Sequence, residues 1–382
     1  MNELLPSHAW EIVERDNWKI LGTMTIADEG FESYFFELDA ESALFITHYK
    51  WHCINLTNGT IRWTMDRIPF HKPGAYLLAD GVLYIDEKIT PDTNDIVAID
   101  PVKGIDKTTG KFLWNYTYAK ENTDGAVVLR SEFGYDENTL VFTISTSMLI
   151  ALNRKTGKLL WKKKLDITSQ GITPFIWNER VYIQGLSGEY RTLLLALDVK
   201  TGQVDDNQSI EIEELMLSFL SPKNQLLIHN NVLIYLSDKM NLVFHDLISK
   251  ETIFKYRLND SLRNYHFFVR DNVLHVNNAY SGATFSIDLG TFAPLPEPTY
   301  VGLKRLPRIQ AHITARNLFV YNVERQKLII ASRHSGKIEA VIDLPTEKDL
   351  PGYHCRSILT LNEIIYIIRG FKDNTVEITA IG

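Results

Sequence analysis

The residues best suited to metal chemistry in this sequence are His48, His52 and Cys53, which lie close together in one short segment. Imidazole nitrogens and thiolates are ligands that zinc prefers in proteins. However, the segment is expected to run from strand to turn to strand. A hairpin does not place two histidines on one face as i, i+4 spacing on a helix does. No fourth ligand is evident, so we predict no metal site.

Nucleophilic catalysis has no recognisable motif. The sequence contains no Gly-x-Ser-x-Gly elbow and no glycine-rich loop that would hold phosphates. Many carboxylates occupy turn positions, where a structural role accounts for them. We therefore predict no catalytic residue and no cofactor. An enzyme that assembles a funnel site from scattered residues, such as a hydrolase, is the alternative, because such sites are recognised by geometry.

Composition narrows the class of partner. The chain has 382 residues, 45% of them hydrophobic, and a formal net charge of −7. No basic stripe is present to displace counterions from phosphates, which argues against nucleic acid and against anionic membranes as partners. The first residues lack the basic and apolar regions of a signal peptide, so a cytoplasmic location is expected. For Cys53 and Cys355, two buried thiols are favoured over one long-range disulfide.

The sequence contains an internal repeat, which is expected to position the side chains considered above. Residues 151–161 read ALNRKTGKLLW, and the pattern returns as CINLTNGTIRW at 53–63 and ALDVKTG at 196–202. A copy stretched by a short insertion runs from 98–100 to 109–114. In three copies a tryptophan follows the glycine by four residues, as Gly59/Trp63, Gly110/Trp114 and Gly157/Trp161.

Each part of the repeat has a physical role. The Asp or Asn at the end of a strand can accept bonds from backbone amides two residues ahead and start a turn. The glycine supplies the positive φ that closes the hairpin. The tryptophan offers a large flat surface for packing one sheet against another. The repeat therefore predicts antiparallel strands in stacked sheets.

The second strand of each repeat has its own start signal, a turn residue before a β-branched or aromatic run. Eight such signals occur, near Ala43, Gly81, Asn138, Glu179, Asn231, Asn272, Asn317 and Glu363. Their spacing is typical of four-stranded propeller blades. The last copy ends after its third strand, and residues 18–26 could supply the fourth. We predict an all-β fold: a single β-propeller domain over 1–382 with eight four-stranded blades closed by an N-terminal strand, and seven blades as the alternative.

The Ala-Leu-Asp-x-x-Thr-Gly-Lys-x-x-Trp unit resembles the repeat of pyrroloquinoline-quinone-like propellers. That family includes quinoprotein dehydrogenases and the lipoprotein scaffold of outer-membrane barrel assembly. The resemblance implies, for an enzyme, a cofactor clamp with a calcium site, a stacking tryptophan and often adjacent cysteines. Cys53 and Cys355 are not adjacent, and the repeat accounts for the tryptophans. We therefore interpret the chain as a non-enzymatic member.

An acidic connection is the best candidate for a partner site. It is predicted to link the fourth and fifth blades, and it contains Asp205, Asp206, Glu211, Glu213 and Glu214. An acidic surface would steer a basic partner. The function predicted is protein binding, with a bacterial immunity-type protein that neutralises a basic toxin as the sharper hypothesis. A scaffold subunit of an assembly complex is one alternative, and a propeller hydrolase or quinone-type enzyme with a central-funnel site is the other.

Overall fold

The protein is described here by a computed structural model that covers strands and tight turns from residue 20 to residue 382. The described residues are 20–27, 34–39, 41–47, 50–66, 73–87, 102–117, 133–145, 148–166, 173–186, 192–212, 226–237, 240–258, 265–270, 272–278, 284–295, 309–313, 316–322, 327–332, 335–344, 354–361, 364–370 and 375–382. None of them forms a helix long and apolar enough to cross a bilayer.

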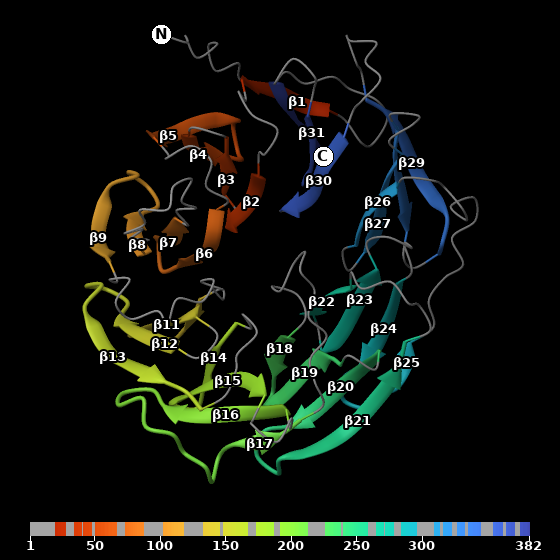
Figure 1. Cartoon of the computed structure of the whole chain (residues 1–382). Helices are drawn as coiled ribbons and strands as arrows, with labels where there is room; N and C mark the ends of the chain where they lie inside the picture. The colour runs from red at the N-terminus through yellow and green to blue at the C-terminus, as the bar shows by residue number, and fades with distance from the viewer. Residues whose placement is uncertain are drawn as a thin grey trace, which may run out of the picture. The chain divides into compact units, whose positions relative to one another are not determined.

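The strands form eight four-stranded sheets (Figure 1). The chain divides into two compact units, one of Phe70–Ser261 and one of Met1–Pro69 with Leu262–Gly382. Each unit holds four of the sheets. The prediction of a single domain over 1–382 stays a prediction.

In the unit of residues 70–261, each sheet contains four strands that follow one another in the chain. The strands are β6 (Pro73–Ala79), β7 (Val82–Glu87), β8 (Val102–Asp106), β9 (Phe112–Tyr116), β10 (Gly134–Tyr135), β11 (Thr139–Ser145), β12 (Met148–Asn153), β13 (Leu159–Lys164), β14 (Phe175–Trp177), β15 (Arg180–Leu186), β16 (Thr192–Asp198), β17 (Ile210–Glu211), β18 (Leu226–His229), β19 (Val232–Leu236), β20 (Asn241–Asp246) and β21 (Glu251–Arg257).

The other unit has three sheets of the same kind and one that joins the two ends of the chain, in the order β1-β32-β31-β30. Its strands are β1 (Ile20–Ala27), β2 (Tyr34–Asp39), β3 (Ser42–Ile46), β4 (Lys50–Asn55), β5 (Thr60–Asp66), β22 (Tyr265–Arg270), β23 (Val273–Asn278), β24 (Thr284–Asp288), β25 (Pro294–Leu295), β26 (Ile309–Ile313), β27 (Asn317–Asn322), β28 (Lys327–Ser332), β29 (Ile338–Asp343), β30 (His354–Leu361), β31 (Ile364–Gly370) and β32 (Thr375–Ile381).

The strand positions agree with the sequence patterns in nearly every repeat. A second strand begins at or within a few residues of each of the eight predicted signals. β1 pairs antiparallel with β32, from Ile20 opposite Ile381 to Ala27 opposite Thr375, so the N-terminal strand completes the last sheet as predicted. One prediction was wrong: the copy before Trp114 contains no insertion in its turn. Its third strand ends at Asp106, not Asp100, and Asp106 stands four residues before Gly110 as in the other copies.

The turn between the third and fourth strands is built by one acidic or amide side chain. In the turn after β16, Asp198 Oδ1 accepts hydrogen bonds from the backbone amides of Lys200 and Thr201 and from the Thr201 hydroxyl. These bonds, led by that from the Thr201 side chain, lower the pKa of Asp198. Gly202 follows with a φ of 68°, a conformation that side chains other than glycine rarely adopt.

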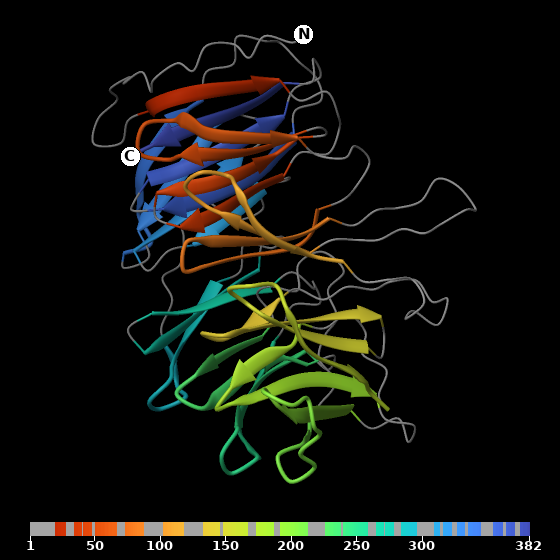
Figure 2. The same ribbon diagram turned by 90° about the vertical axis from the view of Figure 1, so that its left-hand side faces the viewer.

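The fourth strand is the outer edge of its sheet. The strands β9 and β13, which face the viewer in Figure 2, carry several exposed side chains, whereas the third strands β8 and β12 are largely buried. The apolar core therefore lies between sheets and at their second and third strands.

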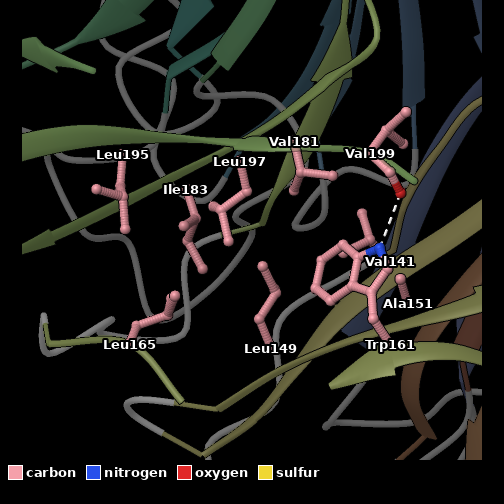
Figure 3. Packing of buried hydrophobic residues seen from close by; sticks show 10 residues of the cluster. All are labelled: Val141, Leu149, Ala151, Trp161, Leu165, Val181, Ile183, Leu195, Leu197 and Val199. Carbon is pink, nitrogen blue, oxygen red and sulfur yellow. Dashed lines mark hydrogen bonds between the residues drawn. The ribbon is translucent and has the colours of Figure 1, made fainter. Parts of the chain in front are cut away.

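Tryptophans join consecutive sheets in the unit of residues 70–261. Trp161 of β13 packs among buried residues of its own sheet and of the β14–β17 sheet, including Val181 and Leu197 (Figure 3). Its indole Nε1 donates a hydrogen bond of 2.8 Å to the carbonyl of Val199. A Cβ atom on Gly202 would lie 2.7 Å from the indole ring, so the close approach also requires glycine. Trp114 joins the preceding pair of sheets in the same way, with a 3.1 Å bond from its Nε1 to the Arg154 carbonyl.

In the other unit a tyrosine makes the corresponding bond. The hydroxyl of buried Tyr366, in β31, donates to the carbonyl of Leu56 over 3.1 Å. Leu56 directly follows the turn residue Asn55, as Val199 follows Asp198 and Arg154 follows Asn153. Tyr366 thus joins the sheet that contains both chain ends to the β2–β5 sheet.

Candidate protein-binding site

The candidate metal residues of the sequence are used in packing where the structure describes them. His52 is buried, stacks on Phe45 with ring centroids 6.2 Å apart, and has its Nδ1 3.0 Å from the Thr64 hydroxyl. Burial, together with nearby Lys50, lowers the pKa of His52 to about 4, so the ring is neutral at physiological pH. Cys53 is also buried. His48 and the side chain of Cys355 lie outside the described residues.

Two buried arginines in the described part each bond to a carboxylate. Arg154 is buried and bonds to Asp80 in the β6–β7 turn, with its guanidinium 5.6 Å from the Tyr135 ring centroid. Arg369 is buried beside Glu377. The described residues include no group of three or more His, Cys, Asp or Glu that could hold a metal ion.

The described part of the acidic connection, residues 205–212, does not link two sheets, which corrects the sequence interpretation. It lies within the β14–β17 sheet, where it interrupts the fourth strand. Val204 forms a bridge with Leu197 of β16, residues 205–209 form a turn, and pairing resumes where Ile210 lies opposite Leu194. The sequence did not reveal this arrangement because the tryptophan that marks the fourth strands β5, β9 and β13 is absent here, and residues 205–209 look like a loop between elements.

Hydrogen bonds hold the turn in place. The backbone amide of Asp205 donates to the Ala196 carbonyl over 2.8 Å, and the Ala196 amide donates to the Ser209 hydroxyl over 3.1 Å. Ser209 therefore replaces a strand carbonyl in the ladder. The carboxylate of Asp205 accepts a 3.0 Å bond from Arg180 Nε and is also 3.0 Å from its terminal nitrogen. Residues 205–209 are thus fixed by hydrogen bonds and an ion pair at the outer edge of the sheet.

The five predicted carboxylates differ in exposure, and the structure describes only three of them. Asp206 and Glu211 are exposed, whereas Asp205 is partly covered by its bond to Arg180. Glu213 and Glu214 lie outside the described residues. Close by in the sequence, Glu179 pairs with Lys200 over 3.3 Å. Of the five predicted carboxylates, Asp206 and Glu211 are therefore the ones that the structure shows as exposed.

An apolar component accompanies these carboxylates and was not identified from the sequence. Ile248, in the turn after β20 of the next sheet, is 66% exposed, the highest value among the large apolar side chains described. Lys250 of the same turn donates to the Asn207 carbonyl, which joins this turn to the acidic connection. Val204 is 36% exposed at the start of that connection. We call Val204, Asp206, Glu211 and Ile248 the acidic patch.

The repeat itself held a signal for Ile248. At the same turn position, two residues after the Asp or Asn, other copies have the polar residues Thr57, Thr108, Lys155 and Lys200. An isoleucine at a position that is otherwise polar indicates an exposed apolar side chain. Exposed apolar groups beside exposed carboxylates are typical of protein-binding surfaces.

Comparisons with known proteins agree with the fold. The family described as outer membrane protein assembly factor BamB matches residues 98–248. The crystal structure of BamB from Moraxella catarrhalis is similar, with a TM-score of 0.58, 15% identity, and coverage of 93% of this chain and 98% of that chain. No curated protein sequence matches this chain.

Two further solved structures share the fold. The computationally designed Ika8 protein has a TM-score of 0.56 and 13% identity, over 92% of this chain and 98% of that one. The dihydro-heme d1 dehydrogenase NirN has a TM-score of 0.57 and 10% identity, over 91% of this chain and 75% of that one. At these identities the similarity shows the fold alone. One fold can occur both in binding proteins and in enzymes.

Proposed function

We propose that this chain, a β-propeller of the pyrroloquinoline-quinone-like family, is a non-catalytic protein that binds another protein through the acidic patch. The exposure of Ile248 next to the ordered carboxylate-bearing turn is the observation that carries the proposal. An exposed apolar anchor within a charged rim is the arrangement that partner proteins use, because burial of the anchor contributes affinity and the charges select the partner. The rigid turn also lowers the entropy lost on binding.

Two finer roles are consistent with this site. A scaffold role in a complex is favoured by the match of residues 98–248 to a family described as an assembly factor. An immunity-type role, in which the patch captures a basic toxin, is favoured by the exposed Asp206 and Glu211. The identity of the partner separates the two.

We also propose that the sheets are blades of one closed ring. The pairing of β1 with β32 and the Tyr366–Leu56 bond support closure on the side of the chain ends. Eight blades follow if every four-stranded sheet belongs to the ring, and seven if one sheet lies outside it.

The binding proposal is tested with the full chain as bait in extracts of its own host. We expect one stoichiometric partner that Ile248→Asp releases. The matched control is Thr57→Asp, which introduces the same charge at the same turn position of another repeat, and it should keep the partner. A partner retained equally by both variants would show that the acidic patch is not the site, and recovery of the chain alone would contradict the protein-binding role.

A further inference from the structure

The outer strands of the sheets differ in charge, and β13 differs most. Its sequence LLWKKK has three consecutive lysines and no acid, whereas β9 (FLWNY) has no charged residue. The strand β21 (ETIFKYR) mixes both signs, and β29 (IEAVID) carries only acids. Lys155 and Lys158 precede β13 in its turn and are exposed. A chain with a net charge of −7 thus concentrates positive charge at one sheet edge.

β13 is an end strand that pairs only with β12 within its sheet. An edge strand presents a row of N–H and C=O groups that can pair with a further strand. Leu159 and Leu160 of this strand are 47% and 44% exposed, and Lys162 is exposed beside them. The edge therefore offers backbone pairing, apolar contact and positive charge together.

The register extends this surface toward the neighbouring sheet. Leu159 lies opposite Leu152 and Lys162 opposite Ile150. Because Leu152 and Ile150 belong to the core between the β6–β9 and β10–β13 sheets, Leu159 and Lys162 lie on the side of β9. On β9 itself, Phe112 and Leu113 are 55% and 52% exposed.

Edge lysines also protect sheets from pairing with one another, and a register shift between Ala151 and Leu152 interrupts the β12–β13 ladder as such protection would. Protection by charge acts against strands of the same charge. It does not oppose an acidic strand, which the lysines attract. Edge protection alone also does not explain why two leucines are exposed next to the charges.

From these features we infer that β13 binds an extended acidic segment of a partner protein, which adds to the sheet as a fifth strand. Its backbone pairs with the outer edge of β13, its acidic side chains meet Lys162 on the face toward β9, and its apolar side chains occupy the opposite face. Strand addition of this kind takes affinity from main-chain bonds and specificity from alternating side chains. The surface is separate from the acidic patch and takes a partner of the opposite charge.

The test uses the full chain and a fluorescein-labelled peptide of alternating Glu and Val, about eight residues long so that it spans the strand. Fluorescence anisotropy at about 0.15 M salt should show saturable binding. The double variant Lys162→Glu/Lys163→Glu should weaken binding about tenfold or more, because both rim charges are reversed. The matched control is Lys255→Glu/Arg257→Glu on β21, which makes the same charge change on another outer strand and should leave binding within about twofold.

Two peptide variants test the mode of binding. A peptide with proline at two central positions cannot donate to the edge and should lose binding. A Lys–Val peptide should not bind. Equal binding of the proline peptide, or equal loss in the β13 and β21 variants, would reduce the effect to general charge attraction and overturn the inference.

Self-association is the other occupant to distinguish. Analytical ultracentrifugation of the chain alone should show no dimer that the β13 variant abolishes. Such a dimer would mean that a second copy of the chain covers β13 and would overturn the inference. Because the peptide assay does not involve Ile248, its failure leaves the proposed function of the acidic patch untouched, and the two proposals can fail separately.

Discussion

Hydrogen bonds between neighbouring sheets use the same kind of acceptor in both units, a backbone carbonyl in a turn, but different donors. In the unit of residues 70–261, Trp161 reaches the Val199 carbonyl from an outer strand. In the other unit, Tyr366 reaches the Leu56 carbonyl from a second strand. Both acceptors follow the Asp or Asn of a turn directly. The turn is therefore the constant part of the contact, since it presents a carbonyl at a fixed place, and the donor can come from any strand that reaches it.

Loss of the tryptophan contact should have the largest effect on the free energy of unfolding, because the indole ring buries a large apolar surface in addition to its hydrogen bond. Trp161→Ala is expected to lower the free energy of unfolding by about 3–5 kcal/mol. Phe254→Ala is the matched control: Phe254 lies opposite Phe244 as Trp161 lies opposite Ala151, but it is only half-buried. Urea denaturation should give less than half the loss for this control. Equal losses would mean that the tryptophan has no special role.

The second-largest effect on the free energy of unfolding is expected from Gly202, which packs against the indole ring of Trp161. Gly202→Ala adds a Cβ atom that would lie 2.7 Å from the Trp161 ring, at a residue with a φ of 68°. We expect a loss of about 1–3 kcal/mol from backbone strain and ring displacement. Gly81→Ala is the control, since its φ of 75° is similar and no atom lies within 4 Å of the added Cβ. The difference between the two losses measures the contact with the indole, and a difference of zero would remove it.

Tyr366→Phe tests the second kind of donor. The variant loses one buried hydrogen bond and leaves the Leu56 carbonyl unpaired, which should cost about 1–2 kcal/mol at neutral pH. Burial raises the pKa of Tyr366 to about 12, above the value near 10 of an unfolded chain. The folded state therefore holds the proton more tightly, and this contribution is complete below about pH 10 and is lost as pH rises toward 12.

Denaturation curves of the wild type and of Tyr366→Phe, measured across that alkaline range, check the prediction. The difference in unfolding free energy between the two proteins should be constant below pH 10 and shrink above it. A difference that does not change with pH would mean that the tyrosine hydroxyl is not held in the fold.

Much of the fold follows from local patterns. The turn residue, the glycine and the β-branched runs act through neighbours in the chain, so the second strands and the Asp198 type of turn could be predicted from sequence. The pairing of β1 with β32 was also predicted, because the last repeat lacked a strand. The repeat before Trp114 was misassigned because Asp100 and Asp106 both fit the pattern locally, and only the register selects Asp106.

The candidate site was less predictable. The acidic residues could be named, but not the fact that Ser209 and Arg180 fix their turn within a strand, because those contacts join residues distant in the chain. The exposure of Leu159 and Leu160 depends on which strand forms the edge, and hydrophobicity alone would have assigned these residues to the core. Pattern indicates which residues form strands, whereas edge and centre are decided by the whole sheet.

The pairing of residue 20 with residue 381 has a consequence for how the protein is made. During synthesis, β1 leaves the ribosome long before β32 exists, so it must wait as an unpaired strand while the intervening sheets form. Contacts between such distant residues are slow to close. The sheet that contains both chain ends therefore completes last, and a shortened or stalled chain keeps an exposed apolar strand that quality-control proteases and chaperones can recognise.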